Sequence, residues 1–84
     1  MRYLRDIPNT AYKISLYQWN GKYILKFEAG GMYEQIYKLD ETEVVTDTEI
    51  DAIVDEILLA QISERFQLMH RDFTDSLRRN NVIF

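Results

Sequence analysis

The clearest hydrophobic pattern lies in residues 12–28, where two runs rich in aromatic and β-branched residues flank Asn20-Gly21. Asn-Gly readily adopts the positive φ angles of a two-residue type I′ turn, and apolar and polar positions alternate on both sides of it. The sequence therefore predicts a β-hairpin with Trp19 opposite Lys22. The apolar pairs that this register places on one face are Ile14 with Phe27 and Leu16 with Leu25.

A third run, MYEQIYKL at residues 32–39, follows Gly30-Gly31 and predicts a third antiparallel strand. Its register stays open. A two-residue turn places Leu25 opposite Ile36, whereas a three-residue loop places Ile24 opposite Ile36 and Lys26 opposite Glu34. A fourth strand is expected either at Val44-Val45 or at residues 2–5, which would pair at an edge of the sheet before Pro8 ends them.

From Thr46 the apolar residues recur at helical spacing, without Gly or Pro up to the end of the chain. Thr46 and Glu49 have the spacing of a capping box, and Asp47 is the rival N-cap. Asn80-Asn81 is the expected C-terminal stop. The apolar positions of this helical region are Ile50, Ile53, Val54, Ile57, Leu58, Ile62, Phe66, Met69, Phe73 and Leu77.

Length limits how this helix can pack. A continuous helix over residues 47–79 would be about 50 Å long at about 1.5 Å per residue, whereas an eight-residue strand spans about 26 Å. The helix must therefore break or extend beyond its sheet. We expect a break near His70, where Asp72 or Thr74 would cap a second helix.

These patterns predict an α+β fold in one domain, residues 1–84, with a meander of three or four strands at 12–39 and a helical region at 46–79. A chain this short forms a small core, and the absence of Cys excludes disulfides, so oligomerisation is the expected source of added stability. We expect a homodimer, because the apolar stripe changes face along the helix. The predicted partner interface consists of Ile62, Phe66, Met69, Phe73 and Leu77.

Charge is distributed unevenly along the chain, whose formal net charge is −4. Residues 1–39 carry a net charge of +3 and residues 40–84 a net charge of −7. The overall acidity argues against indiscriminate nucleic-acid binding, yet a local basic surface on the sheet stays possible. The N-terminal residues lack the apolar core of a signal peptide, and no apolar run reaches bilayer length, so we expect a cytoplasmic protein without a membrane segment.

Catalytic and metal-binding patterns are weak. There is no Cys, the serines lie within predicted strands or helices, and His70 is the single histidine. Asp47, Asp51 and Asp55 share one helical face, but a calcium loop needs a sharp glycine turn that this stretch lacks. The chain is therefore not expected to be an enzyme or to hold a metal, a cofactor or a small-molecule substrate.

The second face of the predicted hairpin carries aromatic and basic residues together. Single-stranded nucleic-acid binders stack bases on such rings while ammonium groups follow the phosphates. Alternatively, these rings are cross-strand packing partners or are covered by a partner subunit. The predicted nucleic-acid-binding residues are Lys13, Tyr17, Trp19, Lys22 and Lys26.

The segment ISLYQWNGKYILKF resembles the opening hairpin of the Whirly and transcriptional-coactivator group of single-stranded-DNA-binding domains. The order of antiparallel strands followed by a long C-terminal helix is similar as well. The resemblance, over about residues 12–66, implies dimerisation through the helix and nucleic-acid binding on the sheet. The chain is also similar to small bacterial proteins with no assigned activity, which implies nothing about chemistry.

Two functions follow as hypotheses. The first is a non-enzymatic module that binds single-stranded nucleic acid on the sheet. The second is a protein-interaction module that binds a partner through its long helix, with Phe66 and Phe73, and through the apolar tail Val82-Ile83-Phe84. Salt-sensitive binding is expected of the first and salt-tolerant association of the second.

Overall fold

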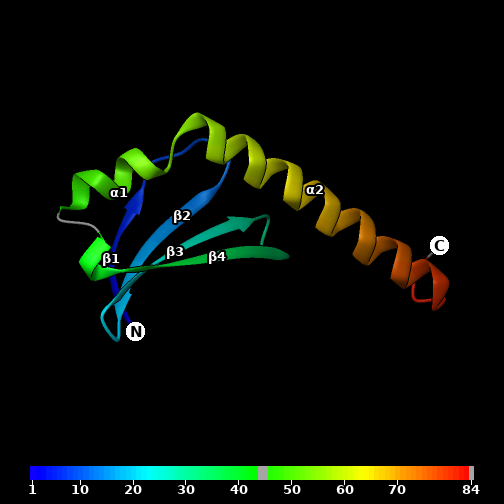
Figure 1. Ribbon diagram of the computed structural model, residues 1–84. Helices are drawn as coiled ribbons and strands as arrows, with labels where there is room; N and C mark the ends of the chain where they lie inside the picture. Colours follow the sequence, from blue (N-terminus) through cyan, green and yellow to red (C-terminus); the bar gives the residue numbers. More distant parts are fainter. Residues whose placement is uncertain (44–45, 84) are drawn as a thin grey trace.

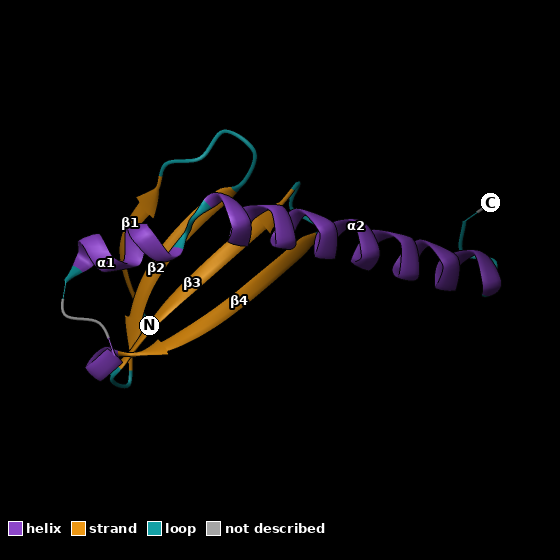
Figure 2. Cartoon of the chain, turned by 45° about the horizontal axis from the view of Figure 1, so that its top comes forward, coloured by secondary structure: helices purple, strands orange, loops and turns teal. Residues whose placement is uncertain are grey.

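The computed structural model describes residues 1–43 and 46–83 and has the expected α+β architecture (Figure 1). Four antiparallel strands form one sheet in the order β1-β2-β3-β4, and the helices follow at the C-terminal end of the chain. Both helices lie on the same side of the sheet (Figure 2). The elements are β1 (Arg2–Ile7), β2 (Lys13–Trp19), β3 (Lys22–Ala29), β4 (Tyr33–Asp40), a 3-10 turn η1 (Glu41–Glu43), α1 (Asp47–Ile53) and α2 (Glu56–Arg79).

The predicted hairpin is confirmed residue by residue. Trp19 pairs with Lys22, and the antiparallel register continues unbroken to Lys13 opposite Glu28. Asn20 and Gly21 have φ angles of 52° and 72°, as a type I′ turn requires.

The predicted third strand is present as β4, but neither expected register is correct. Lys26 pairs with Ile36, one residue away from the two-residue-turn register. Gly30 and Gly31 both have positive φ, and the Met32 N–H donates to the Ala29 carbonyl, so the tight turn does form there. Met32 is then an extra residue before Tyr33 pairs with Ala29, and this bulge shifts the whole strand.

The fourth strand is β1, so the prediction for the N-terminal residues is confirmed, whereas the rival Val44-Val45 lies outside the described residues. β1 pairs antiparallel with β2 from Arg2 opposite Gln18 to Ile7 opposite Ile14. The register shifts by one residue between Tyr3 and Arg5, which makes Leu4 a bulge. The strand ends immediately before Pro8.

The helical region breaks at Val54-Asp55, so the predicted break near His70 is wrong. The Asp55 carboxylate accepts a hydrogen bond from the Leu58 N–H at 2.8 Å and caps α2. An aspartate that bonds a nearby amide competes with continued helix, which explains why the chain turns there. Beyond this cap α2 continues through His70 to Arg79, a length of about 36 Å.

The helix ends follow the sequence in part. Thr46 is the N-cap residue of α1, but its hydroxyl bonds to Thr48 at 2.7 Å instead of capping a backbone amide. The C-terminal stop is confirmed, because Asn81 has a φ of 59° and the Val82 N–H donates to the Leu77 carbonyl at 2.8 Å. Together with the Asn81 N–H bond to Arg78, this is a Schellman motif.

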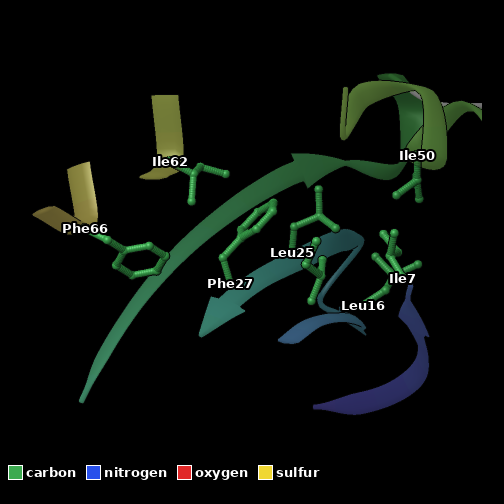
Figure 3. Close-up of a cluster of buried hydrophobic side chains, with 8 residues drawn as sticks. Ile7, Leu16, Leu25, Phe27, Ile50, Ile62 and Phe66 are labelled. Atoms are coloured by element: carbon green, nitrogen blue, oxygen red, sulfur yellow. The ribbon is translucent and has the colours of Figure 1, made fainter. Parts of the chain in front are cut away.

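One hydrophobic core lies between the helices and the covered face of the sheet (Figure 3). Phe27 and Leu16 are fully buried at its centre. Ile50 of α1 closes the core at one end, and Ile62 and Phe66 of α2 cover the other. The whole buried cluster is Ile7, Ile14, Leu16, Leu25, Phe27, Ile50, Ile62 and Phe66.

α2 extends beyond the sheet that it covers (Figures 1 and 2). The molecule measures 49 × 27 × 19 Å and has a radius of gyration of 15.2 Å. A compact chain of this length would have a radius of gyration of about 12 Å. The C-terminal part of α2 therefore lacks a sheet beneath it, as its length predicts.

Candidate functional site

Two surfaces of the molecule lie outside the core and carry the side chains singled out by the sequence. The first is the face of the sheet turned away from the helices, here called the open face. The second is residues 70–79 of α2, here called the projecting half. The open face follows from the strand registers and consists of Tyr3, Asp6, Lys13, Ser15, Tyr17, Trp19, Lys22, Ile24, Lys26, Glu28, Glu34, Ile36, Lys38 and Asp40.

The predicted nucleic-acid-binding residues all lie on the open face, because their positions alternate with those of the core residues along β2 and β3. Trp19 is 52% exposed at the hairpin end. Tyr17 packs edge-on against Tyr3 of β1, with ring centroids 5.7 Å apart. The sequence alone does not identify Tyr3 as part of this surface, because it leaves the pairing of residues 2–5 open.

Tyr3 and Ile24 make the open face a structured surface. The Tyr3 hydroxyl donates to the Asp6 carboxylate at 2.9 Å, and this bond raises the pKa of Tyr3. Ile24 is only 4% exposed although it lies outside the core cluster, and its cross-strand neighbours are Tyr17 and Lys38. Part of this face is thus already packed against itself.

Lys26 is engaged by its own sheet. Its ammonium lies 3.0 Å from a Glu28 carboxylate oxygen and 3.7 Å from one of Glu34. It also lies 5.9 Å from the centre of the Tyr17 ring, within cation–π distance. The Glu28 carboxylate raises the pKa of Lys26. A phosphate would have to compete with these carboxylates for the ammonium.

The charges of the open face cancel. The open face carries four lysines and four carboxylates, so it has no net positive charge at neutral pH. Binding of single-stranded nucleic acid depends on excess positive charge along the path of the backbone. The charged residues are Lys13, Lys22, Lys26 and Lys38, with Asp6, Glu28, Glu34 and Asp40.

The predicted helix interface divides into two groups. Ile62 and Phe66 are buried in the chain's own core, and Phe66 lies against Tyr12 with ring centroids 5.3 Å apart. Met69 is partly buried against the same core. Phe73, by contrast, is 50% exposed. Together with the half-buried Leu77, it is the part of the predicted interface that remains accessible to a partner.

The projecting half begins where α2 passes the first residue of β4. The Tyr33 hydroxyl and His70 Nδ1 are 3.0 Å apart, and the Tyr33 and Phe73 rings meet edge-on at 6.4 Å. His70, the one histidine of the chain, is thereby placed as a hydrogen-bonding partner of the sheet.

Two grooves lie between β4 and the helices. The larger, of about 380 Å³, opens along β4 beside α2. Its lining residues are Gln35, Ile36, Tyr37, Arg65, Leu68, Met69 and Asp72. The smaller, of about 200 Å³, is almost wholly apolar and is lined by Leu25, Phe27, Tyr37, Lys38, Leu39, Ile53 and Leu58.

Two acidic residues of the helical region, Asp51 and Asp55, have structural roles. Asp51 forms an ion pair with Arg5 of β1 at 3.0 Å, and Asp55 caps α2. Over residues 1–43 and 46–83, no group of three or more His, Cys, Asp or Glu side chains is arranged to hold a metal ion.

Comparisons of the chain with protein-family models, with curated proteins and with solved structures gave no match. Neither helix is long and apolar enough, within the part of the chain that the structure describes, to cross a bilayer. The function of the chain must therefore be argued from its own surfaces.

Proposed function

We propose that this chain is a non-enzymatic protein-interaction module that binds a partner through the projecting half of α2 and the neighbouring β4. The observation that carries the proposal is the projection itself. Phe73, in the part of α2 that extends beyond the sheet, is 50% exposed although its ring meets that of Tyr33, the first residue of β4, edge-on. Because about half of Phe73 is already covered, burying the rest against a partner would contribute about 1 kcal/mol, which favours association at this position.

Photo-crosslinking from position 73 tests this proposal directly. Phe73 is replaced by p-benzoyl-phenylalanine, which retains an aromatic ring, and the cells that express the chain are irradiated. We expect crosslinks to a protein partner, and we expect the purified complex to persist at high salt because apolar contacts dominate. The same amino acid at Ile57, which is 70% exposed on the half of α2 that covers the sheet, is the matched control. A position 73 that crosslinks no more than position 57 would contradict the proposal.

Single-stranded nucleic-acid binding on the open face is the second candidate. Its support is the exposed Trp19 beside Tyr17 and Tyr3, with Lys22 at the same end of the hairpin. The balanced charge of this face and the ion pairs of Lys26 make it the weaker candidate.

Fluorescence titration separates the two candidates. An oligo-dT and a duplex of equal length are added at about 50 mM and about 200 mM salt while Trp19 emission is followed. Nucleic-acid binding predicts quenching of Trp19 by the single strand, weakened by salt and by Lys22→Gln. Unchanged Trp19 emission and no binding at the lower salt concentration would exclude it.

A further inference from the structure

β4 is an edge strand in the part of the sheet that the structure describes. Within the described residues, β4 has a strand neighbour on one side only, β3. Residues that flank a two-residue turn form a hydrogen-bonded pair, so Trp19 and Lys22 fix the alternation of bonds across the sheet. The odd-numbered residues of β4 then bond to β3, in agreement with the Glu41 N–H bond to the Gly21 carbonyl at 3.0 Å. The even-numbered residues, Glu34, Ile36 and Lys38, direct their backbone groups outward.

The side chains of these outward-facing residues are self-complementary. Ile36 is 52% exposed at the middle of the strand, and Glu34 and Lys38 lie at equal distances on either side of it. We propose that β4 pairs antiparallel with β4 of a second copy of this chain, centred on Ile36. In this register Ile36 meets Ile36, and each Glu34 meets a Lys38 of the other copy. Opposite charges and apolar pairs directly across two strands stabilise the pairing.

Neighbouring registers are unfavourable. A shift by one residue places side chains of the open face beside those of the covered face. A shift by two residues in one direction places Ile36 opposite Lys38 and Glu34 opposite Asp40, which brings like charges together. The opposite shift places Ile36 opposite Glu34 and leaves Lys38 without an acidic partner. The chemistry of the strand therefore selects the register centred on Ile36.

The covered face fits the same register. Tyr37 of the second copy lies beside Gln35, at the groove of about 380 Å³ that runs between β4 and α2. Tyr37 is 42% exposed in the single chain, so it has apolar surface left to bury. A tyrosine that enters this groove places its ring against Leu68 and Met69 of α2.

The projecting half of α2 gains a surface to pack on, and this part of the inference rests on the proposed function. Leu39 of the second copy lies beside Tyr33, and Tyr33 is the residue against which Phe73 packs. Figure 2 shows α2 continuing past β4 at this end of the strand. Phe73 therefore reaches the apolar groove of the second copy, which is lined by Leu39, Ile53 and Leu58. The product is an eight-stranded sheet in which each long helix extends over the other copy.

Charge reversal with complementation tests the proposed register. Glu34→Lys and Lys38→Glu each bring two like-charge pairs into the homodimer, and each is expected to weaken self-association about tenfold or more. An equimolar mixture of the two variants restores both pairs, because all charges then meet their opposites. The double variant carries both substitutions in one chain, and two copies of it again form both opposite-charge pairs with each other. Sedimentation equilibrium between about 10 µM and about 500 µM measures the self-association of the unmodified chain, of the two single variants, of their mixture and of the double variant.

Arg2→Glu is the matched control, since it makes the same charge change as Lys38→Glu on the other edge strand, β1. It is expected to leave self-association unchanged. Glu34→Lys also removes the ion pair with Lys26, so circular dichroism of each variant checks folding, and recovery in the mixture shows that the variants are intact.

Three results would overturn the inference: an unmodified chain that is monomeric at about 500 µM, single variants that associate as tightly as the unmodified chain, or a mixture that fails to recover. Crosslinking of position 73 to a different protein by a monomeric chain would leave the proposed function standing and refute only this inference. Dimerisation that follows the charge pattern, without crosslinks from position 73, would refute the proposed role of the helix and support the pairing of the strands.

Discussion

The two edges of the sheet differ in the regularity of their backbone and in the residues that follow or flank them. On the β1 side, the Leu4 bulge interrupts the outer edge, Pro8 follows the strand directly, and Arg5 forms an ion pair with Asp51 of α1. On the β4 side, eight residues run in an unbroken register, and the exposed Ile36 lies at their centre. Bulges and prolines are the usual devices by which proteins prevent edge-to-edge association. One edge is thus closed by its sequence, and the other is left available.

The two helices also differ between the β1 side and the β4 side of the sheet. α1 lies over the β1 side and contributes Ile50 to the core, while α2 covers the sheet only as far as Tyr33 and then passes beyond β4. The free edge of β4 and the projecting half of α2 are therefore on the same side of the molecule. A single partner on this side can bury both, which a partner on the β1 side cannot do.

Phenylalanine truncation on the two halves of α2 gives the largest expected contrast. Phe66→Ala removes a buried ring that packs against Tyr12, and we expect it to lower the free energy of unfolding by about 3–5 kcal/mol. Phe73→Ala removes a half-exposed ring, and we expect a loss of less than about 1 kcal/mol from the single chain. Urea unfolding at a low protein concentration measures both. Equal losses would show that the projecting half is packed as tightly as the rest.

Ile36→Lys places a charge at the centre of the free edge of β4. The two lysines would meet at the two-fold axis and replace an apolar pair, so we expect self-association to lose about 2–3 kcal/mol, or about 30–150-fold in affinity. The unfolding free energy of the single chain should change little, because Ile36 is already half exposed. Sedimentation measures the effect, and Tyr3→Lys, at an exposed residue of the other edge strand, β1, is the control. An effect of both variants alike would point to general surface charge.

Arg5→Leu gives the smallest expected effect and asks what keeps the β1 edge closed. The ion pair of Arg5 with Asp51 is partly solvent-exposed, so its loss should cost at most about 1 kcal/mol of unfolding free energy. Self-association should not change, because the Leu4 bulge and Pro8 still interrupt the edge. The appearance of trimers or larger species in light scattering would show that charge, and not backbone geometry, closes this edge.

Local signals allowed most of the sheet to be predicted. Asn20-Gly21 determines the first hairpin, including the pairing of Trp19 with Lys22, because the turn geometry admits a single register. The register of β4 could not be derived in the same way. Both faces of that strand carry apolar residues, such as Ile36 on one and Leu39 on the other, so the alternation gave no preference. The extra residue Met32 then moved the strand by one position.

The helix break was predicted at the wrong place for a related reason. Apolar residues continue across Val54-Asp55 at helical spacing, and the length of the helical region requires either a break or an extension beyond the sheet without specifying a residue. The available signal was the change of apolar face after Ile57, whose side chain is 70% exposed in the structure. Asp55, three residues before Leu58, is the cap that accompanies the change.

The placement of the predicted site residues could be derived where it depended on local strand alternation, and could not where it depended on tertiary structure. That the predicted binding residues share one face followed from strand alternation alone. The ion pairs of Lys26 with Glu28 and Glu34 required the register of β4, which the sequence left open. The division of the helix stripe at Met69 depended on how far the sheet extends beneath α2, a tertiary property that periodicity does not contain.

Residue-resolved amide hydrogen exchange at two protein concentrations, about 10 µM and about 500 µM, tests the difference between the two edges most directly. We expect the amides of Glu34, Ile36 and Lys38 to exchange about tenfold or more slowly at the higher concentration, because a second β4 then bonds them. The outward-facing amide of Asp6 on β1 should exchange equally at both. Exchange of the three β4 amides that is independent of concentration, or slowing on β1 instead, would contradict this expectation.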